Sequence, residues 1–229
     1  MVWQFLRQHF VQIVIAAALA VAVYIPISIY ATYLREQRVA NELASRGGYS
    51  ESYYAGPDWI PQVVRENMPL LDRVRCVYFA ADTKVIEVSL AQLKELTDLD
   101  SLELNHTQVT DADLKHLRGL TNLKRLYLDN TQLTDAGLLH LKGLTNLEEL
   151  GLGATRVTDV GLMYLKQLPQ LKIIYLGNTR VTDAGLEHLK GLTKLDLLSV
   201  ERTEVTAKGR AMFQESLPNC LIEFEPHVN

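Results

Sequence analysis

Four consecutive rows of 24 residues decide the fold of this chain: LTDLDSLELNHTQVTDADLKHLRG (96–119), LTNLKRLYLDNTQLTDAGLLHLKG (120–143), LTNLEELGLGATRVTDVGLMYLKQ (144–167) and LPQLKIIYLGNTRVTDAGLEHLKG (168–191). A fifth row, LTKLDLLSVERTEVTAKGRAMFQES (192–216), is a degraded copy. A fixed period of this length predicts stacked supersecondary units. Such stacks build an extended surface more readily than an enclosed catalytic pocket.

Within one row, leucine-like residues fall at positions 1, 4, 7, 9, 14, 19 and 22. Positions 7 and 9 have the spacing of one face of a strand, and positions 19 and 22 have the spacing of one face of a helix. Each row therefore predicts a strand, a turn, a short helix and a return. Stacking the rows gives an α/β solenoid with parallel strands on the concave face and short helices on the convex face.

Two polar columns accompany the leucines. Position 12 is always threonine, and we expect these buried hydroxyls to form a structural ladder bonded to the turn backbone: Thr107, Thr131, Thr155, Thr179 and Thr203. The TD pair at positions 15 and 16 suits a helix N-cap. A calcium site along the aspartate column is the alternative, but one carboxylate per repeat is few for that ion.

The pattern L-x-x-L-x-L-x-x-T-x-V/L resembles the leucine-rich repeat. Together with the TDAGL helix starts, the arginine-flanked apolar N-terminus and the stretch from Gly47-Gly48 to Gly56-Pro57-x-Trp59, it is similar to bacterial, planctomycete-type membrane-anchored leucine-rich-repeat proteins. This resemblance implies a binding role with no defined ligand. The rows are also similar to those of eukaryotic F-box substrate receptors, which implies a substrate-receptor role as a remote alternative.

Residues 9–34 contain no Lys, Arg, Asp or Glu before Arg35 and are mostly apolar. About 20 helical residues cross a bilayer core, so we predict a transmembrane helix over 9–34 after a short tail, 1–8. A cleaved signal peptide and a buried core helix are the alternatives; the first usually has a shorter apolar run and a small-residue cleavage site. The arginine count on the two flanks leans slightly towards a cytoplasmic repeat domain.

The remaining boundaries follow from composition. We expect a juxtamembrane helix and N-terminal cap over 35–70, repeat units over 71–216 that start at 71, 96, 120, 144, 168 and 192, and a C-terminal cap strand and tail over 217–229. The aromatic group Tyr49, Tyr53, Tyr54 and Trp59 is interpreted as a plug for the open end of the core, or as a partner contact. Cys76 and Cys220 belong to opposite ends, about 25–30 Å apart, too far for a disulfide.

The charge and the residue types of the chain argue against several classes of function. A net charge of −4 and a pI near 5.9 give no electrostatic footprint for nucleic acid. His116 and His140 are neighbours in one column, but two ligands are fewer than a metal site requires. No arrangement of nucleophile, base and oxyanion donors is visible, so we expect neither an enzyme nor a cofactor.

The expected partner face is the concave sheet, where the leucine and threonine columns leave positions 6, 8, 10 and 11 free to vary. Gly151 and Gly153 remove outward side chains from the third row, and Tyr127 and Tyr175 stand about 9–10 Å apart on either side. We therefore predict a shallow slot with aromatic walls. The candidate binding residues are Glu103, Arg125, Tyr127, Asp129, Glu149, Gly151, Gly153 and Tyr175.

These patterns predict a single-pass membrane protein that displays a repeat domain for binding a protein or peptide. Its lipid contact would be residues 9–34, and nucleic acid is not expected as a partner. The alternative of a different class is a structural scaffold that self-associates through the membrane helix or the solenoid edges.

Overall fold

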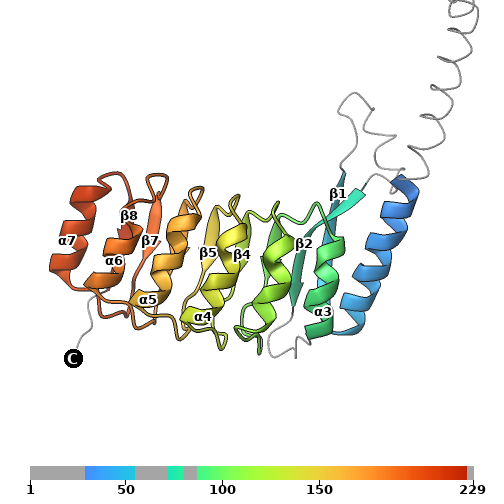
Figure 1. The fold of residues 1–229 in the computed structure, drawn as a ribbon, viewed down its shortest axis with the longest axis horizontal. Helices are drawn as coiled ribbons and strands as arrows, with labels where there is room; N and C mark the ends of the chain where they lie inside the picture. The colour runs from blue at the N-terminus through green and yellow to red at the C-terminus, as the bar shows by residue number, and fades with distance from the viewer. Residues whose placement is uncertain (1–28, 55–71, 80–86, 226–229) are drawn as a thin grey trace, which may run out of the picture.

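The computed structural model describes residues 29–54, 72–79 and 87–225. Eight strands form one sheet in chain order (Figure 1), with β1 antiparallel to β2 and every later pair parallel. The strands are β1 Gly48–Tyr54, β2 Asp72–Phe79, β3 Ser101–Glu103, β4 Arg125–Tyr127, β5 Glu149–Gly151, β6 Ile173–Tyr175, β7 Leu197–Ser199 and β8 Leu221–Glu223.

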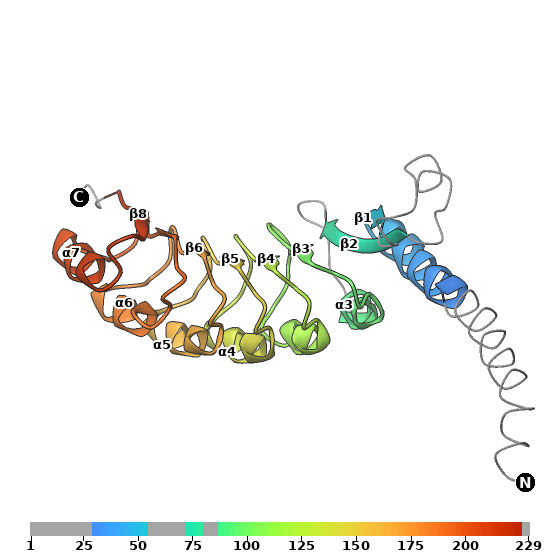
Figure 2. The ribbon, with the colours of Figure 1, turned by 90° about the horizontal axis from the view of Figure 1, so that it is seen from above.

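Short helices line the opposite side of the curved solenoid (Figure 2). They are α3 Glu87–Gln92, η2 Leu93–Glu95, η3 Asp113–Gly119, α4 Asp135–Leu138, η4 Leu139–Gly143, α5 Asp159–Leu162, η5 Met163–Gln167, α6 Asp183–Leu189 and α7 Ala207–Ser216, where η marks a 3₁₀ helix. Parallel strands on one face and helices on the other confirm the solenoid predicted from the 24-residue period.

The core is a stack of identical layers. The central residue of each strand pairs with the same repeat position next door, as in Leu102 with Leu126 and Leu126 with Leu150. These leucines are fully buried. Burying one leucine side chain stabilises a fold by about 1.5–3 kcal/mol, so each added repeat brings its own apolar layer.

The turn after each strand needs a left-handed residue. Position 11 has a positive φ in every row: His106, Asn130, Ala154, Asn178 and Arg202, at 52° to 58°. One residue later, the buried threonine hydroxyl donates a hydrogen bond to the carbonyl three residues earlier, for example from Thr131 to Leu128 at 2.7 Å. The same bond is made in all five rows.

The TD-x-G motif links one repeat to the next. Thr134 caps α4 by accepting a hydrogen bond from the amide of Ala136. Asp111 of the preceding repeat accepts hydrogen bonds from both the amide and the hydroxyl of Thr134, at 2.8 and 2.6 Å. A Cβ placed on Gly137 would lie 2.5 Å from Asp111 Oδ1, so the glycine makes room for the carboxylate. We call this arrangement the carboxylate latch.

The latch recurs in three further pairs: Asp135 with Thr158, Asp159 with Thr182, and Asp183 with Thr206. The two ends of the series differ. Asp113 stands where the other rows have glycine, and its carboxylate accepts the amide and hydroxyl of Thr110 within its own repeat. Ala207 stands where the other rows have the latch aspartate. The row 96–119 thus supplies its own acceptor, and the row 192–216 provides no latch carboxylate.

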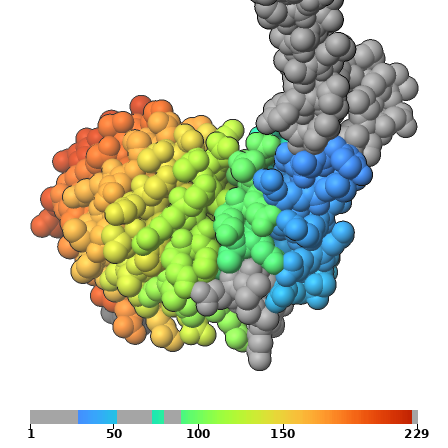
Figure 3. Space-filling view, turned by 45° about the vertical axis from the view of Figure 1, so that its right-hand side comes forward, coloured from blue at the N-terminus to red at the C-terminus, as the bar shows by residue number. Residues whose placement is uncertain are grey.

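A helix over residues 29–45 and strand β1 close the N-terminal end of the stack (Figure 3). Val39 and Leu43 of this helix are buried in the same core as Val77 and Phe79. Gly47, with φ of 81°, ends the helix in the left-handed conformation that favours glycine.

Strand β1 was not predicted, and it changes the role of the aromatic group. Tyr49 does not plug the core: it is 53% exposed and stacks on Tyr78 with ring centroids 5.3 Å apart. Val39 and Leu43 close the end instead. Trp59 and the side chains of Tyr53 and Tyr54 lie outside the described residues.

The predicted transmembrane helix falls mostly on residues 1–28, which are outside the described part of the chain. Its last residues, 29–34, belong to a helix whose described part runs to residue 45. Among the described residues, no helix combines the length and the apolar character needed to cross a membrane.

Candidate binding face

Two rows of side chains cross the concave sheet from strand to strand. In each three-residue strand the central side chain points into the core and the two flanking ones point outward. The first row contains Glu51, Cys76, Ser101, Arg125, Glu149, Ile173, Leu197 and Leu221. The second row contains Tyr49, Tyr78, Glu103, Tyr127, Gly151, Tyr175, Ser199 and Glu223.

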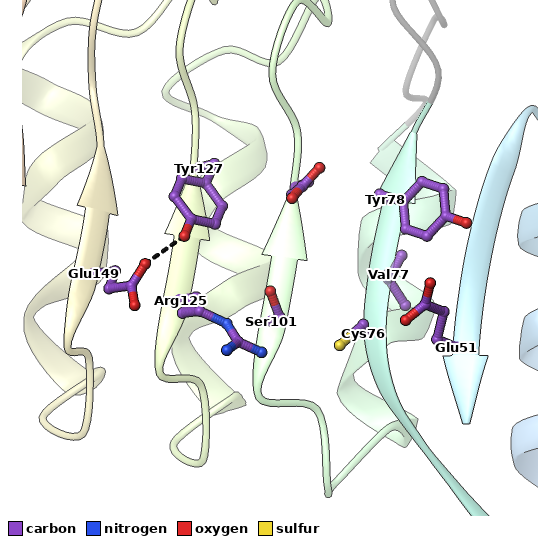
Figure 4. A pocket seen from close by; sticks show the side chains of 9 residues that line it. Glu51, Cys76, Val77, Tyr78, Ser101, Arg125, Tyr127 and Glu149 are labelled. Carbon is purple, nitrogen blue, oxygen red and sulfur yellow. Dashed lines mark hydrogen bonds between the residues drawn. The ribbon is translucent and has the colours of Figure 1, made fainter. Parts of the chain in front are cut away.

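The N-terminal half of this face forms a hollow of about 500 Å³ (Figure 4). We call it the N-terminal hollow. It is lined by Glu51, Cys76, Val77, Tyr78, Ser101, Glu103, Arg125, Tyr127 and Glu149. Four of the eight candidate residues therefore meet in one place: Glu103, Arg125, Tyr127 and Glu149.

Arg125 in this hollow is already paired with a carboxylate that it shares with Arg75. Its guanidinium lies 3.3 Å from Asp100 Oδ1, and Arg75 lies 2.8 Å from the other oxygen of the same carboxylate. Cys76 also approaches Asp100, with 3.9 Å between Sγ and Oδ1. Burial, and then the charge of Asp100, raise the pKa of the Cys76 thiol, which disfavours a reactive thiolate.

The far wall of the hollow is a tyrosine–glutamate pair. The Tyr127 hydroxyl donates a hydrogen bond of 2.5 Å to Glu149 Oε2 (Figure 4). Burial, and then this hydrogen bond, raise the pKa of Tyr127, so the phenol stays protonated. The pair fixes one tyrosine ring at the edge of the hollow and leaves the second Glu149 oxygen without a bond to Tyr127.

The slot expected at Gly151 and Gly153 is closed, which corrects the prediction. The Asp129 carboxylate lies over both glycines and accepts a hydrogen bond of 2.6 Å from the amide of Gly153. Gly151 is buried, and a Cβ there would meet both Asp129 and Tyr127. The glycines therefore make room for Asp129 rather than for a ligand. Burial raises the pKa of this carboxyl.

Tyr175 lies beyond Gly151, outside the N-terminal hollow. Burial raises the pKa of its phenol, followed by the charge of Glu149. From β6 onward the first row becomes apolar, with Ile173 and Leu197 half-buried and Leu221 60% exposed. The first row of the concave face is thus polar or charged from β1 to β5 and apolar from β6 to β8, whereas the second row keeps Tyr175, Ser199 and Glu223 over β6 to β8.

Five residues that line the hollow were not among the candidates: Glu51, Cys76, Val77, Tyr78 and Ser101. Glu51 belongs to β1, which the repeat pattern does not cover. Tyr78 and Ser101 lie in the outward columns, but the period alone does not show where those columns enclose a hollow. The hollow depends on the antiparallel pairing of β1 with β2, which extends the sheet beside the regular repeats and which the repeat pattern does not predict.

The histidine column shows no metal arrangement. His140 Nδ1 lies 2.5 Å from the guanidinium of Arg118. Burial, and then the positive charge of Arg118, lower the pKa of His140. Within residues 29–54, 72–79 and 87–225, no three His, Cys, Asp or Glu side chains are grouped to hold a metal ion.

The family described as leucine rich repeats (2 copies) matches residues 97–140 and 121–162. Residues 97–162 are therefore similar to leucine-rich repeats. A crystal structure of an internalin from Listeria monocytogenes is similar, with a TM-score of 0.52 and 24% sequence identity, over 65% of this chain and 39% of that one. This likeness supports the leucine-rich-repeat fold.

An internalin C2 from the same species is 29% identical with a TM-score of 0.49, over 61% of this chain and 59% of that one. This chain therefore spans less than two thirds of the length of either internalin. The comparison with curated protein sequences gives no match.

Proposed function

We propose that this chain is a membrane-anchored leucine-rich-repeat module that binds a protein or peptide partner on its concave face. The observation that carries the proposal is the N-terminal hollow. Its tyrosines and charged side chains contribute little to the leucine core, yet they converge from β1 to β5. Tyrosine and arginine are enriched among binding hot spots, and concave surfaces are a general property of solenoids. The role is non-catalytic.

Site-specific photo-crosslinking in cells tests the concave face. A photoreactive phenylalanine analogue would replace Tyr49 or Tyr175 on the sheet side, and Val160 or Met163 on the convex side as exposed controls. We expect a discrete crosslinked product from the sheet positions only. Products of equal yield from the convex positions, or none from the sheet, would contradict binding on the concave face.

The membrane part of the proposal rests on the apolar run over 9–34. The full chain should stay with the membrane after extraction at high pH, and a dual reporter fused after Asn229 should be active on one side only. A cytoplasmic signal is expected from Arg35, Arg38 and Arg46 against Arg7. A chain released from the membrane would contradict the anchor.

A self-associating scaffold is the second candidate, because β8 is the last strand of the sheet and Leu221 on it is 60% exposed. Edge strands with exposed apolar side chains can pair with another chain. The mass of the detergent-solubilised full chain decides: a defined homo-oligomer that Leu221→Lys dissociates supports the scaffold, and a monomer contradicts it.

A further inference from the structure

We propose that the N-terminal hollow receives an arginine side chain of a protein partner, with Glu103 as its counter-charge between Tyr78 and Tyr127. This inference rests on the proposed function, since it states which chemistry the concave face recognises.

The charge balance of the hollow favours a cation. Glu103 and Glu149 line it, and Asp100 beside it is paired with Arg75 and Arg125. Three carboxylates thus accompany two guanidinium groups, both of which are held by Asp100. The Glu103 carboxylate is exposed and has no partner among the described residues. An anionic ligand would meet uncompensated negative charge, whereas a cation would complete the set.

The Ser101 hydroxyl is a second polar group at the hollow. Ser101 is only 7% exposed and lines the hollow between Cys76 and Arg125 (Figure 4). Its hydroxyl makes no hydrogen bond to another described residue, and its oxygen is not sealed off from solvent. This oxygen can therefore accept a hydrogen bond from a group that enters the hollow.

The sheet register places the aromatic rings on both sides of Glu103. Tyr78 pairs with Glu103 across β2 and β3, and Glu103 pairs with Tyr127 across β3 and β4. Neighbouring strands are about 4.8 Å apart, so a group bound to this carboxylate lies within reach of both rings. The Tyr78 ring is held by stacking on Tyr49, and the Tyr127 ring by its bond to Glu149.

These features fit a guanidinium better than an ammonium. A guanidinium is planar, stacks on aromatic faces and forms a two-pronged hydrogen bond with a carboxylate. An ammonium is more strongly hydrated and would gain less from the tyrosine faces. The hollow is open along the concave surface, so an extended partner segment can carry the side chain in from above.

Saturation-transfer NMR with the full chain in neutral detergent micelles tests the proposal, because the method detects weak ligands of large particles. The probe is a short Gly/Ser peptide with one central arginine, compared with the same peptide carrying lysine or citrulline, which keeps the shape of arginine without its charge. We expect binding of the arginine peptide at least about tenfold tighter than that of the citrulline peptide. The affinity should fall as salt rises.

Two variants locate the site. Glu103→Gln should weaken the arginine peptide about tenfold. The matched control is Glu223→Gln, which removes the same charge from the same row at β8 and should leave the affinity unchanged. Ser101→Ala should weaken it by a smaller factor, without loss of the folded state in circular dichroism.

The outcomes separate this inference from the proposed function. Equal binding of the arginine and citrulline peptides, or an equal effect of both glutamate variants, overturns the arginine site. Equal or tighter binding of the lysine peptide overturns the choice of arginine. If Tyr49 and Tyr175 still give concave-face crosslinks in those cases, the function stands and only the ligand chemistry is wrong. Loss of the crosslinks overturns both.

Discussion

At the scale of single residues, the carboxylate latch explains why the helix start reads TD-x-G. The threonine hydroxyl both caps its own helix and donates to the aspartate of the preceding repeat. The glycine of each row leaves space for the aspartate of the preceding row, as Gly137 does for Asp111. A local motif is thus the product of contacts that cross from one repeat to the next.

Gly137→Ala should destabilise the protein by about 2 kcal/mol, since the added methyl would collide with Asp111 Oδ1 and lie 3.0 Å from Leu133 Cδ2. Urea unfolding of the full chain followed by circular dichroism measures the change. Gly191→Ala is the matched control, because a Cβ there meets nothing within 4 Å. Removing the carboxylate with Asp111→Ala should make the Gly137→Ala effect smaller, and strictly additive effects would argue against the latch.

Ala154 is the residue at which the turn conformation and the side chain disagree. Its φ is 52°, whereas the neighbouring repeats have asparagine at the same position, Asn130 and Asn178. The left-handed conformation costs an ordinary residue roughly 1–2 kcal/mol, and asparagine tolerates it better. Ala154→Asn should therefore raise the free energy of unfolding by about 0.5–1 kcal/mol.

The measurement is the urea midpoint at constant slope. Ala136→Asn in the first turn of α4 makes the same chemical change in a helical conformation and should give no gain. A midpoint that does not rise for Ala154→Asn would show that the turn is not strained.

At the scale of elements, the two ends of the latch series show how a repeat is adapted to its place. Asp113 departs from the glycine of the other rows because its carboxylate holds Thr110. Ala207 carries no carboxylate, so Asp183 and Thr206 form the last latch among the described repeats. Deviations from the consensus therefore coincide with the two ends of the described latch series.

Asp113→Gly restores the glycine of the other rows and should nevertheless destabilise the first repeat by about 1–3 kcal/mol, because the amide and hydroxyl of Thr110 lose their acceptor. Hydrogen exchange of the Thr110 amide should speed up in this variant. Ala207→Asp, which restores the other consensus residue, is the control and should change stability by less than about 0.5 kcal/mol. A gain in stability for Asp113→Gly would mean that the consensus outweighs the local contact.

The elements also show what the sequence can predict. The period placed the strands β3 to β7 and the helices behind them, because every row repeats one spacing of leucines. Neither β1 nor the closed slot could be predicted. The strand β1 pairs antiparallel with β2 outside the repeat, and Asp129 turns over the glycines of its neighbour through a contact between rows. Four of the candidate residues line the N-terminal hollow because the repeat pattern in the sequence identifies the outward-facing positions. The pattern does not cover β1, so the residue that β1 contributes to the hollow could not be predicted.

At the scale of the whole molecule, the solenoid depends on its N-terminal cap, and Glu36 is an unusual part of it. Its carboxylate is 2% exposed, accepts the amide of Val74 at 3.1 Å and lies 3.8 Å from Arg73 Nε. Burial is the main reason that the pKa of this carboxyl is raised above its ordinary value of 4.5. The protonated form is therefore favoured in the folded state relative to the unfolded chain.

The sign of the pH dependence follows. The stabilisation that comes from the raised pKa of Glu36 is fully present below pH 4.5 and is lost as pH rises through the folded-state pKa. Glu36→Gln keeps an oxygen for the Val74 amide and should remove this loss, so the variant gains stability relative to the wild type as pH rises above 4.5. Urea unfolding across this range measures the difference. The same substitution at exposed Glu215 controls for the lost charge, and parallel curves for wild type and Glu36→Gln would contradict the assignment.

The position of the N-terminal cap also leads us to predict the order in which parts of the molecule unfold. Because each repeat contacts only its neighbours, the stability of a solenoid is close to a sum over repeats and interfaces, and terminal caps protect the stack. Leu43→Asp places a charge in the core beside Val77 and Phe79, at a cost of several kcal/mol. Amide exchange should then become fast in β2 and β3 first, with protection recovering towards β7.

Leu221→Asp makes the same change at an exposed site and should leave β2 and β3 protected. Uniform loss of protection from β2 to β8 in Leu43→Asp would instead mean that the helix, the hairpin and all the repeats unfold as one cooperative unit.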